Sequence, residues 1–384
     1  MLEIEYTAPP SVTAAVRALG RTEDVRFSPD NRRLAVASFY RNRIAVFDVD
    51  VRSSSGTPQV ALTGGVELAS PVLQSPHGLD FIDDRTLIVT SRGSDVALFE
   101  LPPGEEVVRT HEVLPIGSWP ANAATLLHTP GSVAVSHAGD DGCEVLICNN
   151  YAHTVTRHRA ASDRTRALKT SEILLRKYLH IPDSVAVSRD RRWIAVSNHS
   201  THDVLLYENS PDLNPETKPD GILRGVLYPH GLRFSADGRH LFVADAGAPY
   251  LHVYAQDFDE WRGVRDPAAS VKIMDDAAFE MGRHIPQSGG PKGLDIDAAS
   301  RVAVVTSEYQ PLAFFDMPAL LRHTVAGDAA REQTMLRFDH ELSRMQDEAV
   351  TADKLVRLDA MLTSISWRIT APIRRLKSIV SGRQ

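Results

Sequence analysis

The 384-residue sequence predicts an all-β fold: a six-bladed β-propeller closed by an N-terminal strand and followed by a C-terminal α-helical extension. Two observations carry this prediction. A unit of three short apolar strands recurs six times, and each copy opens on a Pro-x-Gly-Leu sequence or a variant of it. The turns between the first and second strands are rich in Asp, Asn and Gly, which favour tight hairpins.

The six copies begin at Thr22, Pro76, Pro130, Pro182, Pro229 and Pro291. One such sheet cannot bury both of its faces, whereas a ring of sheets can, and the ring leaves only short protected edges. The alternative, six unrelated hairpins in a sandwich, leaves the recurring opening sequence unexplained. The last copy lacks an outer strand, and we expect the alternating residues 2–6 to supply it. Residues 1–322 are therefore predicted to form the propeller, and residues 323–384 the helical extension.

The composition excludes several protein classes. With 43% hydrophobic and 24% charged residues it is that of an ordinary soluble globular protein. The chain has no apolar run of the roughly 18–20 residues that a membrane span requires, and its start does not resemble a signal peptide. Cys143 and Cys148 are five positions apart on one predicted strand, hence on opposite faces. We expect a cytoplasmic protein, and the net charge of −7 argues against a nucleic-acid partner.

The repeated unit resembles the NHL, YVTN and gluconolactonase-like β-propellers. In these, a P-x-G-[LV] sequence opens the innermost strand and VAD or VSN ends the second, as at residues 243–245 and 196–198 here. The resemblance covers about residues 20–320. It implies the fold strongly and the function weakly, because this fold hosts lactonases, lyases, esterases and binding scaffolds.

Polar side chains are predicted to meet at one mouth of the propeller channel. In an antiparallel blade, the start of the innermost strand and the end of the second strand lie at the same edge of the sheet. Six such openings around a narrow axis make a candidate site for a small sugar-like ligand or a peptide. The predicted ligand-binding residues are Glu23, His77, Asp183, His230 and Lys292 from the strand openings, with Arg92, Asn150, Asn198, His199, Asp245 and Glu308 from the second strands.

Four of these residues form a candidate metal set. Glu23, His77, Asp183 and His230 offer two oxygen and two nitrogen ligands for a divalent cation such as Ca²⁺, Mg²⁺ or Zn²⁺. A bound cation would lower the pKa of a water molecule and polarise an ester carbonyl. Gluconolactonase-like enzymes, however, bind their metal with Glu, Asn and Asp side chains, and Lys292 brings a positive charge here. A metal-free polar mouth or sugar-binding pocket therefore stays open as the alternative.

The extension has its own pattern. The apolar residues Met335, Phe338, Leu342, Met345, Ala349, Ala352 and Val356 alternate spacings of three and four, as in the seam of a coiled coil that would make a homo-oligomer. A helix docked on the propeller would show the same stripe. The end of the chain is basic, and it predicts contact with an anionic membrane or a partner, or packing on the acidic propeller, through Trp367, Arg368, Arg374, Arg375 and Lys377.

The sequence SWRITAPIR within residues 365–376 resembles the C-terminal tail of many bacterial glycosyltransferases and related proteins of surface-polysaccharide synthesis. The resemblance implies a bacterial protein working at the inner membrane with polysaccharide enzymes. Our leading hypothesis is therefore a binding or scaffold protein of surface-glycan assembly, peripheral on the membrane. The alternative is a metal-dependent lactonase, hydrolase or lyase acting on a sugar-derived substrate at the channel mouth. A third hypothesis is a protein–protein hub with an inert channel.

Overall fold

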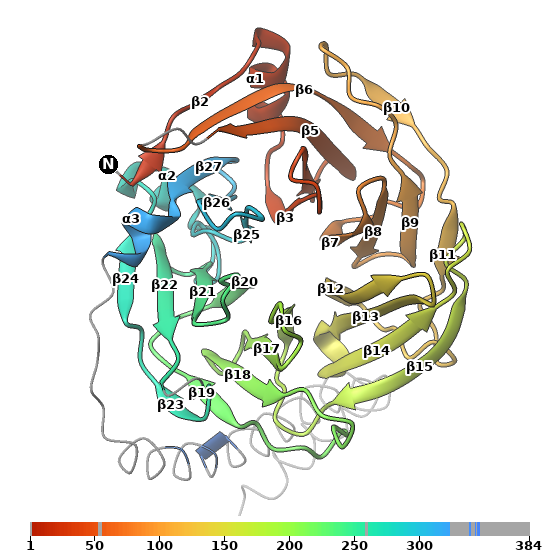
Figure 1. Cartoon of the computed structure of the whole chain (residues 1–384), viewed down its shortest axis with the longest axis vertical. Coiled ribbons are helices and arrows are strands. Elements are labelled where there is room, and N and C mark those ends of the chain that lie inside the picture. The colour runs from red at the N-terminus through yellow and green to blue at the C-terminus, as the bar shows by residue number, and fades with distance from the viewer. Residues whose placement is uncertain are drawn as a thin grey trace, which may run out of the picture.

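Six antiparallel sheets surround a central axis as the blades of a β-propeller (Figure 1). The computed structural model describes residues 2–52, 56–257 and 260–322, together with Phe338, Leu342, Arg344 and Met345. The blades follow one another around the ring in chain order, as the colours of Figure 1 show. The predicted fold class is confirmed.

Each blade is built from the axis outward. The innermost strands are β3 (Thr22–Phe27), β7 (Pro76–Asp83), β12 (Pro130–Gly139), β16 (Pro182–Val187), β20 (Pro229–Phe234) and β25 (Leu294–Ile296). The second strands are β4 (Arg33–Ser38), β8 (Thr86–Ser91), β13 (Gly142–Asn149), β17 (Trp193–Asn198), β21 (His240–Asp245) and β26 (Val302–Val305). Five of the six innermost strands begin at the residue that opens the sequence repeat.

The outer half of each blade varies more. The third strands are β5 (Arg43–Arg52), β9 (Val96–Glu100), β14 (Thr154–Ala160), β18 (Asp203–Glu208), β22 (Tyr250–Ala255) and β27 (Ala313–Asp316). The fourth strands are β6 (Gln59–Ala69), β11 (Gly117–Trp119), β15 (Leu168–Leu175), β19 (Gly221–Leu223), β24 (Ala269–Lys272) and β1 (Glu3–Ile4). Three further strands add in parallel at the outside, β2 (Tyr6–Thr7) and β10 (Thr110–Glu112) on β6, and β23 (Gly263–Arg265) on β19.

The ring is closed by the first strand of the chain. β1 pairs antiparallel with β27, so that Glu3 lies opposite Phe315 and Ile4 opposite Phe314. Ile4 is buried in the apolar cluster that the last blade shares with the first. The prediction that residues 2–6 supply the missing outer strand is confirmed for Glu3 and Ile4.

Apolar side chains fill the space between neighbouring blades. The buried hydrophobic residues form six clusters, each contributed by two successive blades. Cys143 belongs to the cluster between the second and third blades, and Cys148 to that between the third and fourth. The two thiols therefore lie on opposite faces of β13 as predicted, and both are free.

The described helices are short and lie outside the blades. They are α1 (Pro10–Arg17), α2 (Asp276–Gly282) and α3 (Met317–Leu321), with a 3₁₀ turn at Asn150–Ala152. None of them is long and apolar enough to cross a membrane. In the extension, Leu342 and Met345 are buried in the cluster between the third and fourth blades, and Phe338 packs against it. This part of the predicted seam thus docks on the propeller, and the rest lies outside the described residues.

Carboxylates at the axis tie neighbouring innermost strands together. Asp24 Oδ2 accepts a hydrogen bond from Leu79 N (3.1 Å) in the next blade, and Asp80 Oδ2 accepts one from Val135 N (2.7 Å). Asp295 Oδ2 joins the last blade to the first through Phe27 N (2.7 Å).

Burial raises the pKa of these three carboxyl groups. The pKa reaches about 7 in Asp80 and about 6 in Asp24 and Asp295, because the nearby Arg26 offsets only part of the cost of burying a charge. The axis is therefore held together by carboxyl groups that retain a proton to unusually high pH.

The raised pKa of Asp80 predicts a loss of stability as pH rises. Between its unfolded pKa of about 3.9 and its folded pKa near 7, the folded chain holds the extra proton, so this contribution falls with increasing pH by up to about 1.4 kcal/mol per pH unit. We expect Asp80→Asn to remove it. The measurement is the free energy of unfolding in urea from pH 4.5 to 8 for the wild type and Asp80→Asn.

The matched control is Asp84→Asn, which removes an exposed carboxylate from the turn of the same hairpin. The stability advantage of the wild type over Asp80→Asn should shrink as pH rises through this range. A constant difference between the two proteins would contradict the assignment.

Candidate functional site

The openings of the innermost strands bring five ionisable side chains together at one mouth of the channel. Glu23, His77, Asp183 and His230 are the second residues of their strands, and Lys292 occupies the same position in the sixth repeat. All five are at most 5% exposed. Because the six strands run in the same direction along the axis, their second residues meet at one end. The predicted convergence of these residues is found in the structure.

Glu23 is surrounded by cationic and imidazole groups. Lys292 Nζ lies 3.1 Å from both of its carboxylate oxygens, and Arg21 donates to Oε1 through Nε. His230 Nε2 lies 3.1 Å from Oε2. Burial opposes the ionised form, but Lys292 and the neighbouring imidazoles outweigh it and hold the pKa of Glu23 well below its usual range.

Asp183 is the second anion of the site. Its Oδ1 accepts hydrogen bonds from Asn150 Nδ2 (2.7 Å) and Arg92 Nη2 (3.2 Å). Its Oδ2 lies 3.1 Å from His230 Nε2 and 3.8 Å from His199 Nδ1. Burial again opposes ionisation, yet His230 and the other positively polarised neighbours lower the pKa of Asp183 strongly.

The glycine at the third opening makes room for one of these contacts. A Cβ atom at Gly131 would lie only 2.1 Å from Asn150 Oδ1. Any larger residue would displace the amide that donates to Asp183. The opening that contributes no functional group to the mouth therefore admits Asn150 from the 3₁₀ turn that follows the adjoining second strand.

The two histidines occupy different electrostatic positions. His230 Nε2 bridges the two carboxylates, whereas His77 Nε2 lies 2.8 Å from Arg92 Nη2. Burial and then Arg92 lower the pKa of His77 well below 6.5, so this ring is neutral near pH 7 and its Nε2 accepts from the guanidinium. Among the described residues, His77 Nδ1 is buried without a hydrogen-bond partner.

Glu23, His77 and His230 form a group that could hold a metal ion. Their ligand atoms lie within 4.8 Å of one another, and Glu23 Oε2 is 3.1 Å from His230 Nε2 and 3.8 Å from His77 Nε2. Around an ion with bonds of about 2.1 Å, neighbouring ligands are about 3.0–3.5 Å apart. Asp183 lies beside this group, with Oδ2 3.1 Å from His230 Nε2 and Oδ1 3.7 Å from His77 Nε2, so the two contacts involve different oxygens.

Two cations stand against a metal in the arrangement observed. Arg92 faces the His77 nitrogen that would be a ligand, and Lys292 already neutralises Glu23. Burial lowers the pKa of Lys292, although the charge of Glu23 resists this. The Arg92 side chain is 26% exposed, whereas that of Asp183 is only 3% exposed. The donor set therefore fits an ion if Arg92 turns outward.

The other predicted residues divide into two groups. Arg92, Asn150 and His199 reach the site through Asp183. Asn198 instead binds the backbone of Tyr178 and His180, and Asp245 accepts from three backbone amides and lies 3.1 Å from His252 Nε2. These two hold the entry loops in place. Glu308 is half-buried and makes no hydrogen bond or ion pair within the described part of the chain.

The sequence analysis did not select Arg21, nor the apolar rim of the mouth. Arg21 binds Glu23, donates to Tyr40 Oη (3.0 Å) and stacks on the Phe39 ring. Most of the large hydrophobic residues that are exposed lie at this end of the ring: Tyr40, Tyr151, Leu227, Met281, Ile285 and Tyr309. Arg21 directly precedes the first repeat opening at Thr22, and this position next to Glu23 could have identified it as a residue of the mouth. The mouth thus combines a buried charged floor with an exposed, partly aromatic rim.

Comparisons with known proteins do not assign this site. No protein-family model matches the chain, and no curated protein matches it. Among solved structures it is similar to a functionally unknown protein from Desulfotomaculum acetoxidans, at 13% identity and a TM-score of 0.44, over 77% of this chain and 85% of that one. The fold therefore rests on the strand pairing and the site on its geometry. Membership of the NHL or YVTN type stays a prediction.

Breaking the pair between Lys292 and Glu23 should destabilise the ring. Lys292→Met leaves a buried carboxylate with fewer partners, and losing one member of a buried pair costs about 3–5 kcal/mol. The double variant Glu23→Gln/Lys292→Met should recover part of this loss because no unpaired charge remains. The measurement is the free energy of unfolding in urea at pH 7.

Lys272→Met is the matched control, since it removes an exposed ion pair with Asp276 and should change stability little. Equal losses in the single and double variants would contradict the electrostatic account of the pair.

Proposed function

We propose that the protein is a metal-dependent hydrolase or lyase acting at the channel mouth on an anionic, sugar-like substrate. The observation that carries the proposal is the buried group of Glu23, His77 and His230, whose ligand atoms lie within 4.8 Å of one another. Asp183 adjoins this group, with Oδ2 3.1 Å from His230 Nε2. Two imidazoles in the set favour Zn²⁺ or another first-row transition metal over Ca²⁺ and Mg²⁺. When bound, such an ion would activate a water molecule and polarise a carbonyl.

The chain's own residues provide the rest of the chemistry. Arg92 must move away from His77 before an ion can bind there. Once it has turned outward, its guanidinium group is available to bind a substrate carboxylate or phosphate through two parallel hydrogen bonds. Arg21 adds positive charge at the same mouth. Burial lowers the pKa of His199, so its ring is neutral at pH 7 and able to accept a proton. The exposed rings of Tyr40, Tyr151 and Tyr309 offer faces against which a sugar ring can pack.

A second candidate function is binding without chemistry, as expected for a scaffold. It is favoured by one observation: Lys292 and Arg21 pair with Glu23, and Arg92 pairs with Asp183. In this case the charged mouth would recognise a small ligand or a peptide directly, and Arg92 would be required for binding.

Metal titration of the full chain separates the two functions. We expect the wild type to bind one equivalent of Zn²⁺, measured by calorimetry and by elemental analysis after dialysis. His230→Ala should weaken binding by at least about 100-fold, because even outer-shell partners of metal ligands are worth 10–100-fold. Arg92→Ala should bind Zn²⁺ as well as or better than the wild type, since it removes the competing cation.

His137→Ala is the matched control, because this partly exposed histidine lies on β12 outside the metal group and, within the described residues, pairs with Asp141. Circular dichroism establishes that each variant is folded. If the wild type binds none of Zn²⁺, Mn²⁺, Mg²⁺ and Ca²⁺, the metal-dependent function is overturned and the second candidate, ligand binding without a metal, remains. Binding by the wild type justifies screening lactones and sugar esters for turnover.

We further propose that this activity belongs to surface-polysaccharide synthesis at the inner membrane, in partnership with its enzymes. The support is the resemblance of residues 365–376, which lie outside the described residues. Removing residues 346–384 keeps the docked Leu342 and Met345, and should abolish co-sedimentation with anionic vesicles while leaving the propeller folded. Unchanged co-sedimentation of the truncated protein would exclude the membrane contact, and an unchanged oligomeric state would exclude assembly through this segment.

A further inference from the structure

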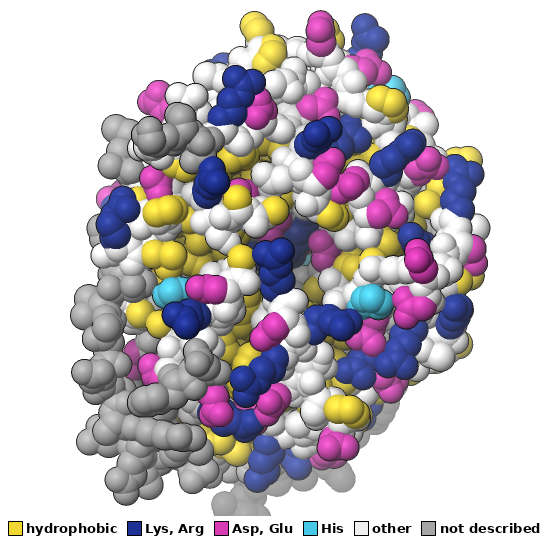
Figure 2. Space-filling view, viewed as in Figure 1, with side chains coloured by type: hydrophobic (Ala, Val, Ile, Leu, Met, Phe, Trp, Pro, Cys, Tyr) yellow, Lys and Arg dark blue, Asp and Glu magenta, His cyan; other side chains and the backbone are white. Residues whose placement is uncertain are grey.

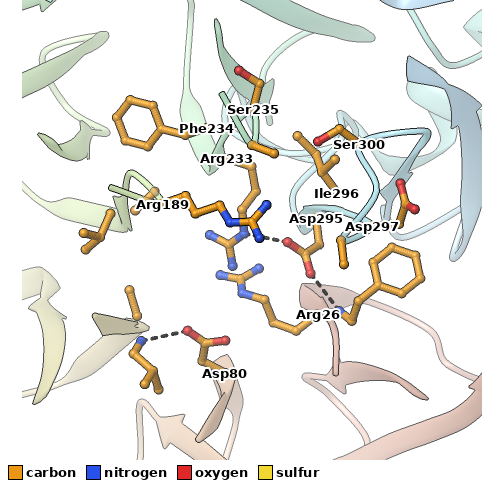
Figure 3. Close-up of a pocket in the computed structure, with 17 residues that line it drawn as sticks. Arg26, Asp80, Arg189, Arg233, Phe234, Ser235, Asp295, Ile296, Asp297 and Ser300 are labelled. Carbon is orange, nitrogen blue, oxygen red and sulfur yellow. Dashed lines mark hydrogen bonds and ion pairs between the residues drawn. The ribbon is translucent and has the colours of Figure 1, made fainter. Parts of the chain in front are cut away.

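A second polar cavity lies at the opposite end of the channel from the metal set. It has a volume of about 350 Å³ and is lined where the innermost strands end, at Phe27, Val187, Phe234 and Ile296 among others (Figure 3). A volume of this size lies within the range of small-molecule sites. The cavity is open to solvent on a face whose centre is hollowed between charged side chains (Figure 2).

Three arginines from three blades point into this cavity and toward one another (Figure 3). Arg26 comes from β3, Arg189 follows β16, and Arg233 comes from β20. Guanidinium groups are permanently charged, and their mutual repulsion is costly where water is partly excluded. Arg26 is only 2% exposed, so water cannot solvate its charge.

The carboxylates of the cavity do not use up these donors. Asp295 Oδ1 accepts a hydrogen bond from Arg233 Nε (2.7 Å), and its Oδ2 accepts one from the backbone amide of Phe27. Asp80 accepts only backbone amides, from Phe81 N (2.9 Å) and Val135 N (2.7 Å). These two carboxylates are therefore engaged in joining the blades, and the third carboxylate of the lining, Asp297, accepts hydrogen bonds from backbone amides of its own turn. Because burial raises the pKa of Asp80 to about 7, that group cancels only part of the positive charge near neutral pH.

Several guanidinium donors are left over. Arg26 binds Asp24 and the carbonyls of Val25 (2.7 Å) and Leu294 (3.2 Å) through Nη1 alone. Its Nε is buried and has no hydrogen-bond partner in the part of the chain that the structure describes. Arg189 makes no hydrogen bond or ion pair within the described residues. Buried donors normally find an acceptor, and an unsatisfied group of this kind calls for an explanation.

We infer that this cavity binds the phosphoryl group of a small ligand, held by Arg26, Arg189 and Arg233. A tetrahedral oxyanion presents several acceptor oxygens to the converging planar forks and removes their repulsion. The cavity has room for a phosphate ion and also for a small phosphate ester, and the titration below distinguishes the two. This site is separate from the metal set, since it lies at the other end of the innermost strands.

The experiment is calorimetric titration of the full chain at pH 7 with inorganic phosphate and, separately, with a hexose 1-phosphate. We expect saturable binding of at least one of the two probes. Arg189→Gln should weaken it about tenfold or more, because one charge-assisted hydrogen bond is worth at least that factor. Arg189 is exposed and outside the blade contacts, so this variant should fold. Arg233→Gln tests a second donor.

The matched control is Arg85→Gln, which removes an exposed arginine from the β7–β8 turn, outside the cavity lining, and should leave binding unchanged. Asp183→Asn, at the other mouth, should also leave it unchanged, so failure of one site does not imply failure of the other. Tighter binding of the ester identifies an organic phosphate, and tighter binding of phosphate identifies the free ion. Absence of binding by both probes, or equal affinities of the wild type and Arg189→Gln, would overturn the inference.

Discussion

The common direction of the six innermost strands is the constraint on which both ends of the channel depend. Each blade begins its inner strand at the same end of the axis, so the second residue of every repeat meets its counterparts there. The residues that end these strands meet at the opposite side. A substitution at one repeat position therefore changes a single wall of a shared site. The ring converts six weakly similar sequence segments into two concentrated groups of side chains.

The carboxyl groups at the two ends of the channel have opposite pKa shifts. At the first mouth, Glu23 and Asp183 face cations and imidazoles directly, and their pKa values are lowered. At the second, Asp80 receives only neutral backbone amides, and its pKa rises to about 7. The difference follows from the partners, because burial opposes ionisation of all three groups. Ionised carboxylates able to hold a cation thus lie at one end, and arginines with unused donors at the other.

Much of the fold was accessible from the sequence because the repeat is local. The opening residues and hairpin turns mark each strand, and even the closing pair of β1 and β27 followed from counting strands. The convergence at the first mouth followed from the same register. The role of each side chain did not. Asn198 and Asp245 end their strands and bind backbone atoms of the entry loops, as Asn149 does at the end of β13. Asn150 comes one position later, in the 3₁₀ turn, and this shift along the chain brings its amide to Asp183.

The second mouth is only partly marked in the sequence. Arg26 and Arg233 both lie four residues after their repeat openings at Thr22 and Pro229, whereas Arg189 lies seven residues after Pro182. The extension poses a different problem, because its regular spacing fits two structures equally well. An apolar stripe records that one face of a helix is covered, but not what covers it. Burial of Leu342 and Met345 among residues of the third and fourth blades identifies the propeller as the cover for that turn of helix. A coiled coil through the same residues would require them to leave this cluster and expose its apolar surface, which the hydrophobic effect opposes.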